Sequence, residues 1–293
     1  MKKILITGAN SYIGMSFEKY IKENYPNDYI VDTVDMIDGT WRQKCFSEYD
    51  SVFHVAGIAH SDNGKISDEK AKLYYAVNTD LTVETAKKAK ADGVKQFIFM
   101  SSAIVYGDSA PIGKSKLITK DTPLNPANCY GDSKVQAEKG LLPLNDHSFK
   151  VVILRPPMIY GPGSKGNYPV LSKLARKLPV FPKADNQRSM LYIENLTNFV
   201  RFMVDNEEEG IFWPQNGEYS DTARLVEMIA AAHGKKMLLV PGFGWALKLM
   251  SHVTGLVNKA FGSLSYDMAM SEYQENYRVC TLEDSIERTE KEA

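Results

Sequence analysis

The chain has little cysteine and almost no net charge. Only three cysteines, Cys45, Cys129 and Cys280, occur among 293 residues, and their spacing matches neither a metal site nor a disulfide framework. The formal net charge is −1, which argues against the basic stripe that a nucleic-acid-binding protein needs. These shortages favour a cytoplasmic protein with free thiols, without a bound metal and without a nucleic-acid partner.

Long apolar segments are also missing from the chain. The first apolar run ends at Gly8, which is too short for the core of a signal peptide. The stretch 237–247 is interrupted by proline and glycine and falls short of the ~20 residues that span a bilayer, so no transmembrane segment is expected. The stretch 243–261 is apolar apart from two lysines. Packing inside the protein or against a second subunit is favoured there, with peripheral membrane contact left open.

Short apolar runs that alternate with helical stretches are what the first half does contain. Continuous apolar runs suit strands of a parallel sheet that is covered on both faces. Strands are expected at 2–7, 29–34, 51–57, 95–102 and 150–156, and helices at 14–25, at 71–94 and around Tyr130. This order predicts an α/β fold with a Rossmann-type, doubly wound parallel sheet over residues 1–164.

The strand pattern fades beyond residue 165. Helical stretches at 169–178, 193–206 and 222–234 alternate there with turns rich in proline and glycine. We therefore expect a smaller, mostly helical substrate lobe over 165–293, with the chain free to cross back between the two parts and the ligands bound in the cleft. The charged C-terminus from Glu283 is expected to be a solvated helix end.

The segment "TGANSYIG", residues 7 to 14, lies where the first strand turns into the first helix. Glycine lets a backbone approach a pyrophosphate, and a helix N-terminus offers free N–H donors. Ser11 stands where the usual pattern has a middle glycine. The segment still predicts a dinucleotide site, whose loop residues are Gly8, Asn10, Ser11, Tyr12, Ile13 and Gly14.

An acidic residue near the end of the second strand should hold the adenosine ribose hydroxyls. Both Asp32 and Asp35 qualify, and Asp35 lies 21 residues beyond Gly14. No arginine or lysine follows closely enough to bind a 2′-phosphate, which favours NAD as the cofactor and leaves NADP as the alternative.

Two further stretches bear on catalysis. A strand ends at Ser101 and Ser102, and ligands bind at the carboxyl ends of strands in open sheets. Downstream, Tyr130 and Lys134 are four residues apart, so they share one face of a helix. A nearby ammonium, together with the positive nicotinamide ring, is expected to lower the phenol pKa from ~10 and so to prepare Tyr130 for proton transfer with a sugar hydroxyl. Ser102 would hold the carbonyl oxygen that forms.

In this order, these features resemble the extended short-chain dehydrogenase/reductase family, and within it the NAD-dependent sugar-nucleotide epimerase/dehydratase group that includes UDP-glucose 4-epimerase. The resemblance runs over nearly the whole chain: "TGANSYIG", "VFHVAG" (52–57), "NTDLT" (78–82), "SSAIVYGD" (101–108), "YGDSK" (130–134), "RPPMIYGPG" (155–163) and "RSMLYIENL" (188–196). It implies a catalytic triad of Ser102, Tyr130 and Lys134, a nucleotide-sugar substrate and a homodimer as one common assembly.

The same resemblance implies further roles outside the triad. Ala56, Gly57 and His54 would lie beside the cofactor, as would Pro157. Asn78 would support Lys134 through water. Arg188 would grip the substrate diphosphate, since a guanidinium fork suits phosphate oxygens.

Two departures from the family pattern narrow the activity. Dehydratases carry Asp-Glu after the catalytic residue, whereas this chain has Ala103 and Ile104. The stretch 36–50 is also too short for the extra helix and strand of full-length epimerases. The resemblance therefore implies a 4-epimerase that works through a 4-keto sugar, with a 4-keto-sugar reductase and a non-catalytic dinucleotide sensor as alternatives.

Overall fold

A computed structural model describes residues 1–58, 66–183, 185–244 and 260–292. Its centre is a six-stranded sheet in the order β10-β6-β4-β3-β1-β2, with every neighbouring pair parallel. The strands are β1 Lys2–Thr7, β2 Tyr29–Val34, β3 Ser51–His54, β4 Gln96–Met100, β6 Lys150–Leu154 and β10 Gly210–Phe212. The predicted Rossmann-type sheet is confirmed.

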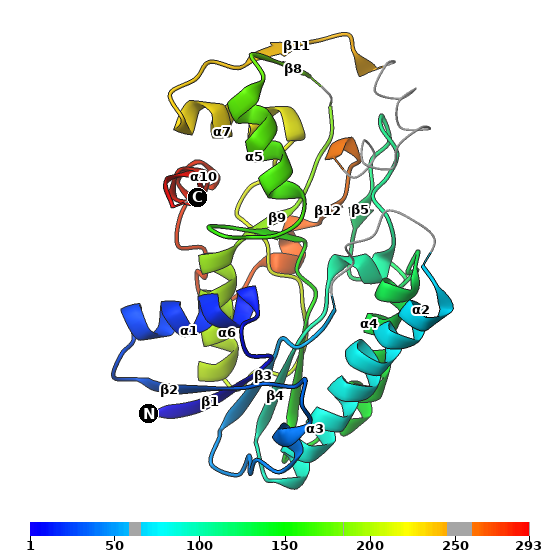
Figure 1. Cartoon of the computed structure of the whole chain (residues 1–293), viewed down its shortest axis with the longest axis vertical. Coiled ribbons are helices and arrows are strands. Elements are labelled where there is room, and N and C mark those ends of the chain that lie inside the picture. The colour runs from blue at the N-terminus through cyan, green and yellow to red at the C-terminus, as the bar shows by residue number, and fades with distance from the viewer. Residues whose placement is uncertain (59–65, 184, 245–259, 293) are drawn as a thin grey trace.

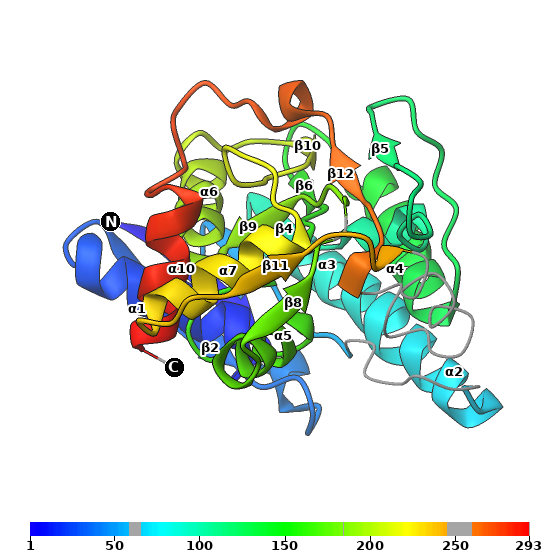
Figure 2. The ribbon, with the colours of Figure 1, turned by 90° about the horizontal axis from the view of Figure 1, so that it is seen from above.

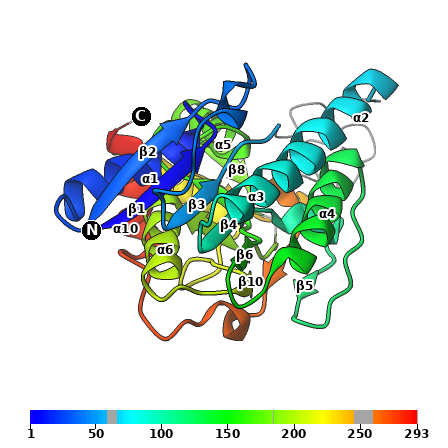
Figure 3. The same cartoon turned by 90° about the horizontal axis from the view of Figure 1, so that it is seen from below.

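Helices cover both faces of this sheet, as Figures 1 and 3 show. The helices α1 (Tyr12–Asn24) and α6 (Ile193–Asp205) pack together on one face. The helices α2 (Asp68–Tyr75), α3 (Leu81–Ala91) and α4 (Cys129–Leu141) lie on the other. Alternate residues of β1 serve the two sides, because Ile4 and Ile6 belong to the α1/α6 core and Leu5 to the α3/α4 core. Both faces of the sheet are therefore buried beneath helices.

The second part of the structure stands above the carboxyl ends of the strands in Figure 1, and Figure 2 shows it from above. It contains α5 (Asn167–Lys177), α7 (Thr222–Ala232) and α10 (Leu282–Lys291), with α7 packed against both of the others. Three short parallel pairs tie it together: β7 Met158–Tyr160 with β9 Met190–Tyr192, β8 Val180–Pro182 with β11 Leu238–Val240, and β5 Leu117–Ile118 with β12 Ser265–Tyr266. After α5 and β9, the chain returns to the central sheet as helix α6 and strand β10, and it then re-enters the second part at α7. The chain therefore crosses between the two parts.

Several elements differ from the sequence-based expectation. The helix expected at 71–94 is divided by a π-helical turn, Ala76–Asp80, that separates α2 from α3. Strand β3 ends at His54, three residues early, because the chain bends toward the glycine loop: the Val55 and Ala56 amides both donate to the Thr7 carbonyl. Between β2 and β3 only a 3₁₀ turn, Thr40–Arg42, is present, as the short segment 36–50 predicts.

The C-terminal segment is not the solvated helix end that its charge suggested. Helix α10 buries Leu282 and Ile286 against α7, and Glu290 is 5% exposed. The other charged side chains of α10 lie on its outer face, while Leu282 and Ile286 face inward at helical spacing, so the high charge hid an amphipathic helix.

Neither a transmembrane segment nor a metal site is expected from the sequence, and the structure bears on both points. No helix in the described ranges combines the length and apolar character needed to cross a bilayer. Most of 243–261 lies outside the described residues. Within the part of the chain that the structure covers, no group of three or more His, Cys, Asp or Glu side chains is arranged to hold a metal ion.

Candidate active site

The glycine loop joins β1 to α1 at the carboxyl edge of the sheet. Gly8 has φ +113°, and a Cβ there would lie 2.8 Å from the Ala56 amide nitrogen. Asn10 has φ 63°, a conformation that asparagine tolerates. Ser11 takes the N-cap position, with its hydroxyl accepting from the Gly14 amide at 3.2 Å. The residue that departs from the glycine pattern therefore begins the helix.

The loop also suits an anion electrostatically. Helix α1 has no acidic residue in its first turn, so no side chain competes for the free N–H groups at its N-terminus. Tyr12 and Ile13 occupy that first turn, and the buried Tyr12 hydroxyl has no hydrogen-bond partner among the described residues. A Cβ at Gly161 would lie 2.8 Å from that hydroxyl. Gly161 directly follows β7, so the start of α1 contacts the segment by which the chain enters the second part of the structure.

The two candidate aspartates lie in different surroundings. The Asp32 carboxylate, within β2, accepts from the Tyr49 hydroxyl at 2.9 Å. Asp35 directly follows β2, whose last residue, Val34, accepts from the amides of Gly8 and Ala9. Asp35 is thus the acid beside the glycine loop, and this position favours it for the ribose.

The chain after β3 forms the next wall of the edge. Asn78, in the π-helical turn, is fully buried and bonds the Ile58 backbone in both directions: its Oδ1 accepts from Ile58 N at 2.8 Å, and its Nδ2 donates to Ile58 O at 3.2 Å. A Cβ at Gly57 would lie 3.0 Å from Asn78 Oδ1 and 3.4 Å from Lys134 Nζ. Gly57 therefore exposes backbone directly in front of the lysine.

His54 lies deeper than the resemblance suggested. Its ring is fully buried, with Nδ1 2.7 Å from Thr7 Oγ1 and Nε2 3.0 Å from Thr82 Oγ1. Burial is the main reason that its pKa falls to about 3, and the Lys134 charge adds to the effect. His54 is therefore a neutral link between β1, β3 and α3, rather than a side chain that faces the cofactor edge.

The start of helix α4 brings Tyr130 to Ser102. Asn128 caps α4 by accepting from the Gly131 amide at 2.9 Å. A Cβ at Gly131 would lie 2.9 Å from the Ile104 carbonyl, so the helix packs closely on the 3₁₀ turn Ala103–Tyr106 that follows Ser102. This packing brings the Ser102 side chain near enough to the Tyr130 hydroxyl to lower the pKa of the phenol.

Lys134 lies one turn beyond Tyr130 and is 6% exposed. Its Nζ donates to the Met100 carbonyl at 2.9 Å and lies 4.7 Å from the centroid of the Phe99 ring. Ser102, Tyr130 and Lys134 therefore come together at the carboxyl ends of β4 and its neighbours, as their spacing predicts.

Without the cofactor's positive charge, the Tyr130 pKa lies above its ordinary value. Burial raises the pKa of this phenol to about 12, and the nearby Ser102 side chain opposes that rise. Burial likewise lowers the pKa of Lys134 to about 8, against the attraction of Glu138. Removal from water thus outweighs the pairing that the i,i+4 spacing suggested.

The sequence interpretation missed Glu138 and Arg155. These two form a buried ion pair beneath the catalytic residues, with Arg155 Nη2 2.6 Å from Glu138 Oε2. One signal was available, because Glu138 continues the four-residue spacing of Tyr130 and Lys134 along the same helix face.

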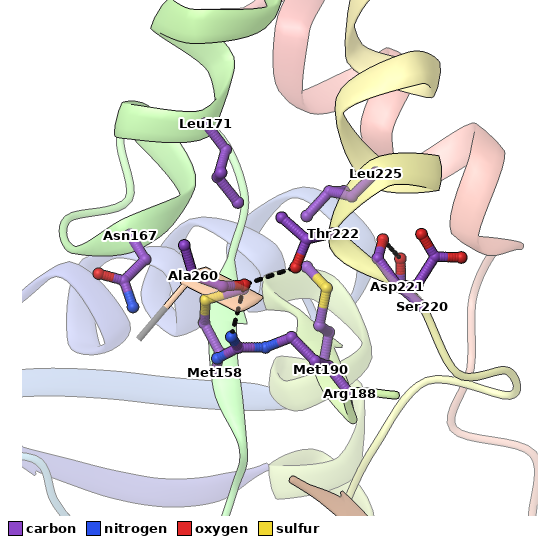
Figure 4. Close-up of a pocket in the computed structure, with 10 residues that line it drawn as sticks. All are labelled: Met158, Asn167, Leu171, Arg188, Met190, Ser220, Asp221, Thr222, Leu225 and Ala260. Atoms are coloured by element: carbon purple, nitrogen blue, oxygen red, sulfur yellow. Dashed lines mark hydrogen bonds between the residues drawn. The ribbon is translucent and has the colours of Figure 1, made fainter. Parts of the chain in front are cut away.

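Arg188 and Pro157 lie between the carboxyl edge of the sheet and the second part of the structure, which contains α5, α7 and α10. Pro157 is buried between β6 and β7. Its neighbour Met158 lines a small cavity of about 10 Å³ together with Arg188, as Figure 4 shows. Arg188 Nη1 donates to the Ala260 carbonyl at 3.1 Å, and burial lowers the Arg188 pKa to about 10. The cavity has room for about one water molecule, so a diphosphate could enter only if its walls moved apart.

Comparison with known proteins bears on the whole arrangement. The model of the "NAD dependent epimerase/dehydratase family" matches residues 4–213. A UDP-glucose 4-epimerase of Vibrio cholerae is 33% identical over an alignment 293 positions long, which covers 92% of this chain and 88% of that protein. An Escherichia coli O157:H7 4-epimerase of N-acetyl-alpha-D-glucosaminyl-diphospho-ditrans,octacis-undecaprenol is 28% identical, covering 71% of this chain and 64% of that one.

Solved structures share the fold at low sequence identity. A dTDP-4-dehydrorhamnose reductase from Bacillus anthracis in complex with NADP aligns with a TM-score of 0.74 at 17% identity, covering 99% of both chains. A UDP-glucuronic acid 4-epimerase from Bacillus cereus in complex with NAD aligns with a TM-score of 0.73 at 17% identity, covering 99% of this chain and 98% of that one. This chain therefore shares its overall fold with an epimerase, even though its segment between β2 and β3 is short.

Proposed function

The chain belongs to the NAD dependent epimerase/dehydratase family, and from that premise we propose that it is a nucleotide-sugar 4-epimerase that works through a transient 4-keto sugar. It is an NAD-dependent enzyme of the extended short-chain dehydrogenase/reductase type. The observation that carries the proposal is the meeting of Ser102, Tyr130 and Lys134 at the carboxyl edge of the sheet, beside Gly57. The relative from Vibrio cholerae supports the choice of a UDP-sugar as the first substrate to test.

The residues at the edge fit a dinucleotide. Gly8 and Gly57 sit where any side chain would collide with Ala56 or Asn78, so the backbone is left bare along the path that a pyrophosphate and a nicotinamide ribose need. Asp35 is placed to accept from the ribose hydroxyls. Arg42, the first basic residue after β2, is held by Glu84 at 2.5 and 2.7 Å, which supports NAD over NADP because this cation is already paired.

In the proposed reaction Tyr130 takes the proton of the sugar 4-hydroxyl and later returns it. Bound NAD would accept the C4 hydride and give it back on the opposite face of the sugar. Ser102 donates to the 4-oxygen while it carries carbonyl character, and the Lys134 cation stabilises the Tyr130 phenolate. Since burial raises the Tyr130 pKa to about 12, the phenol holds its proton until further positive charge reaches the site.

Arg188 is proposed as the contact for the substrate diphosphate. A guanidinium that burial has partly stripped of water gains most from an anion, and phosphate oxygens match its fork. Because the adjoining cavity is small, the proposal requires α5 and α7 to separate as the nucleotide enters.

A 4-keto-sugar reductase is the second candidate, supported by the close fold match to dTDP-4-dehydrorhamnose reductase. Both activities use the same three residues, and they differ in whether the cofactor is kept or consumed. A 4,6-dehydratase is disfavoured because Ala103 and Ile104 offer no acid where water would be eliminated.

The first experiment distinguishes the two candidates. The purified protein is denatured, the released dinucleotide is measured by chromatography, and interconversion of UDP-glucose and UDP-galactose is followed without added cofactor. The epimerase proposal predicts bound NAD and turnover. Stoichiometric consumption of NAD(P)H with a 4-keto sugar, and no interconversion of any UDP-, dTDP- or GDP-sugar, would favour the reductase.

The second experiment tests the catalytic tyrosine. Tyr130→Phe removes only the hydroxyl, so kcat should fall by ~10²–10⁴ while NAD affinity stays within about twofold. Tyr75→Phe is the matched control, because its hydroxyl bonds Asp132 at 2.8 Å near the same helix and is assigned no chemical role. Normal turnover by Tyr130→Phe would refute the mechanism and leave only dinucleotide binding intact. A wild-type protein that binds NAD and turns over no nucleotide sugar would instead favour a non-catalytic dinucleotide sensor.

A further inference from the structure

Three consecutive residues at the end of β4 face helix α4. The Met100 carbonyl accepts from Lys134 Nζ at 2.9 Å, the Ser101 hydroxyl donates to Glu138 Oε1 at 2.5 Å, and the Ser102 side chain lies near enough to Tyr130 to affect its pKa. The helix partners are residues 130, 134 and 138, which lie one turn apart along a single face. The catalytic serine is therefore next to a residue whose side chain is held by Glu138.

Glu138 itself is fixed from the opposite side. Arg155, at the end of β6, donates to Glu138 through Nε at 3.1 Å and through Nη2 at 2.6 Å. Arg155 Nη1 donates to the Tyr106 hydroxyl at 2.7 Å, which also accepts from Trp213 Nε1 at 2.7 Å. Such a chain of buried, satisfied polar groups leaves the carboxylate a single position.

We propose that Glu138 is a positioning residue of the catalytic centre, which holds the Ser101–Ser102 corner and the Lys134 ammonium in register from the third turn of α4. The inference rests on the proposed function for its kinetic consequence, but its structural consequence can be measured without any sugar. Glu138 touches neither the reacting atoms nor the edge of Gly57.

The charges around Lys134 give this role an electrostatic side. On its own helix, Glu138 opposes the lowering of the Lys134 pKa by burial. From β3, His54 is neutral because burial depresses its pKa to about 3. Arg155, which follows β6, is paired with the Glu138 carboxylate, and from the π-helical turn Asn78 contributes only a neutral amide. Glu138 is therefore the anion that favours a charged Lys134.

The key variant replaces the ion pair by apolar side chains, Glu138→Leu with Arg155→Met. Removing both charges together avoids a buried unpaired ion, and such replacements are often neutral or stabilising. The double variant should melt within a few degrees of the wild type. If Glu138 served stability alone, the double variant would therefore keep its kcat. If Glu138 positions the catalytic groups, kcat should fall even though the protein stays folded.

The first readout is the titration of Lys134 by NMR of lysine labelled with ¹³C at Cε, assigned with Lys134→Met. Losing the nearby anion should move the Lys134 midpoint down by about one pH unit. Glu290→Gln is the control, because Glu290 is also buried but bonds Ser172 and His233 far along the chain. An unchanged midpoint in the folded double variant would overturn the electrostatic part of the proposal.

The second readout is kinetic and uses UDP-galactose as substrate. The double variant should lose at least about tenfold in kcat with KM and NAD affinity within about threefold, and the alkaline limb of its kcat profile should move with the Lys134 midpoint. Glu138→Gln with Arg155→Met restores an acceptor for Ser101 without a charge, so it should recover kcat in part and leave the alkaline limb shifted. Glu290→Gln should match the wild type.

Ser101→Ala is the independent variant, since it removes one hydroxyl and leaves the ion pair in place. It should lower kcat about tenfold because Ser102 is no longer held by its neighbour, while the Lys134 midpoint stays unchanged. Wild-type kcat in both Ser101→Ala and the Leu/Met variant would refute the positioning role. A wild-type protein without turnover would refute the proposed function instead, and the NMR titration would still report on Glu138.

Discussion

Three ionisable side chains around the cofactor edge, His54, Tyr130 and Lys134, are each shielded from bulk water. Burial lowers the pKa of His54 to about 3 and of Lys134 to about 8, and it raises the pKa of Tyr130 to about 12. All three shifts favour the neutral form of the group. At neutral pH the protein alone therefore keeps Tyr130 as the neutral phenol, while Lys134 is still mostly protonated.

The buried imidazole should make the stability of the fold depend on pH. His54 has a folded pKa of about 3, below its ordinary value of 6.5, so the unfolded chain binds a proton in this range and the folded chain does not. Its contribution is complete above pH 6.5 and is lost as the pH falls, by about 1.4 kcal/mol per pH unit. Urea unfolding at pH 6 and pH 5 should show this slope in the wild type and a shallower one in His54→Asn. His147→Asn, which changes an exposed histidine, is the control, and equal slopes in all three proteins would contradict the assignment.

Two aspartates can be separated by their effect on cofactor affinity. Asp35→Asn should weaken NAD binding by about ten- to a hundredfold, the size of a hydrogen bond to a charged group. Asp32→Asn should leave affinity within about twofold, since its carboxylate is engaged by Tyr49. Calorimetric titration of both variants measures the difference, and the reverse order would assign the ribose to Asp32.

At the scale of elements, the π-helical turn between α2 and α3 has a clear structural use. It lies opposite the Gly57–Ile58 backbone and supplies Asn78 to both polar groups of Ile58. Isolated π turns occur often at functional sites, where one extra residue redirects a side chain. Here the redirected amide stabilises the backbone that faces the cofactor edge.

Removing that amide should affect both stability and binding. Asn78→Ala leaves the Ile58 N–H without its acceptor, so the free energy of unfolding should fall by about 1–3 kcal/mol. NAD affinity should fall as well, because the Gly57 backbone is no longer fixed. Asn24→Ala, in an exposed helix end, is the matched control. Unfolding by urea and NAD titration give the two values, and an unaffected Asn78→Ala protein would show that the turn has no such role.

At the scale of the whole molecule, helix α10 closes the upper part. Its Ser285 hydroxyl lies 2.5 Å from the Tyr160 hydroxyl, and its Glu290 carboxylate accepts from Ser172 at 2.8 Å. Arg288 pairs with Glu194 at the start of α6. One helix thus contacts β7, α5 and α6 as well as α7, and residues of β7, α5 and α7 also line the Arg188 cavity.

The docking of α10 can be measured through one apolar side chain. Ile286 is 1% exposed, so Ile286→Ala should destabilise the protein by about 2–5 kcal/mol. Glu287→Ala removes only an exposed pair with Lys291, and its effect should stay below about 1 kcal/mol. Urea unfolding of the two variants gives both values. A silent Ile286→Ala change would mean that α10 is not part of the folded unit.

The sequence predicted best what depends on local pattern. Apolar runs identified the sheet, and the spacing of Tyr130 and Lys134 placed both residues on one face of a helix, because both patterns are read within a few residues. It failed where distant segments meet. The choice between Asp32 and Asp35 depends on Tyr49, and the depth of His54 depends on Thr82. The Glu138–Arg155 pair joins residues whose partnership no spacing announces.

The outermost strand β10 has a consequence for how the chain is made. Its residues, 210–212, pair with β6, while α6, which covers one face of the sheet, spans residues 193–205. A nascent polypeptide that has left the ribosome only as far as β6 therefore carries an open strand edge and an uncovered apolar face. Until residues 155–212 emerge, that surface is available to chaperones or to other incomplete copies, and premature termination in this interval should yield insoluble fragments.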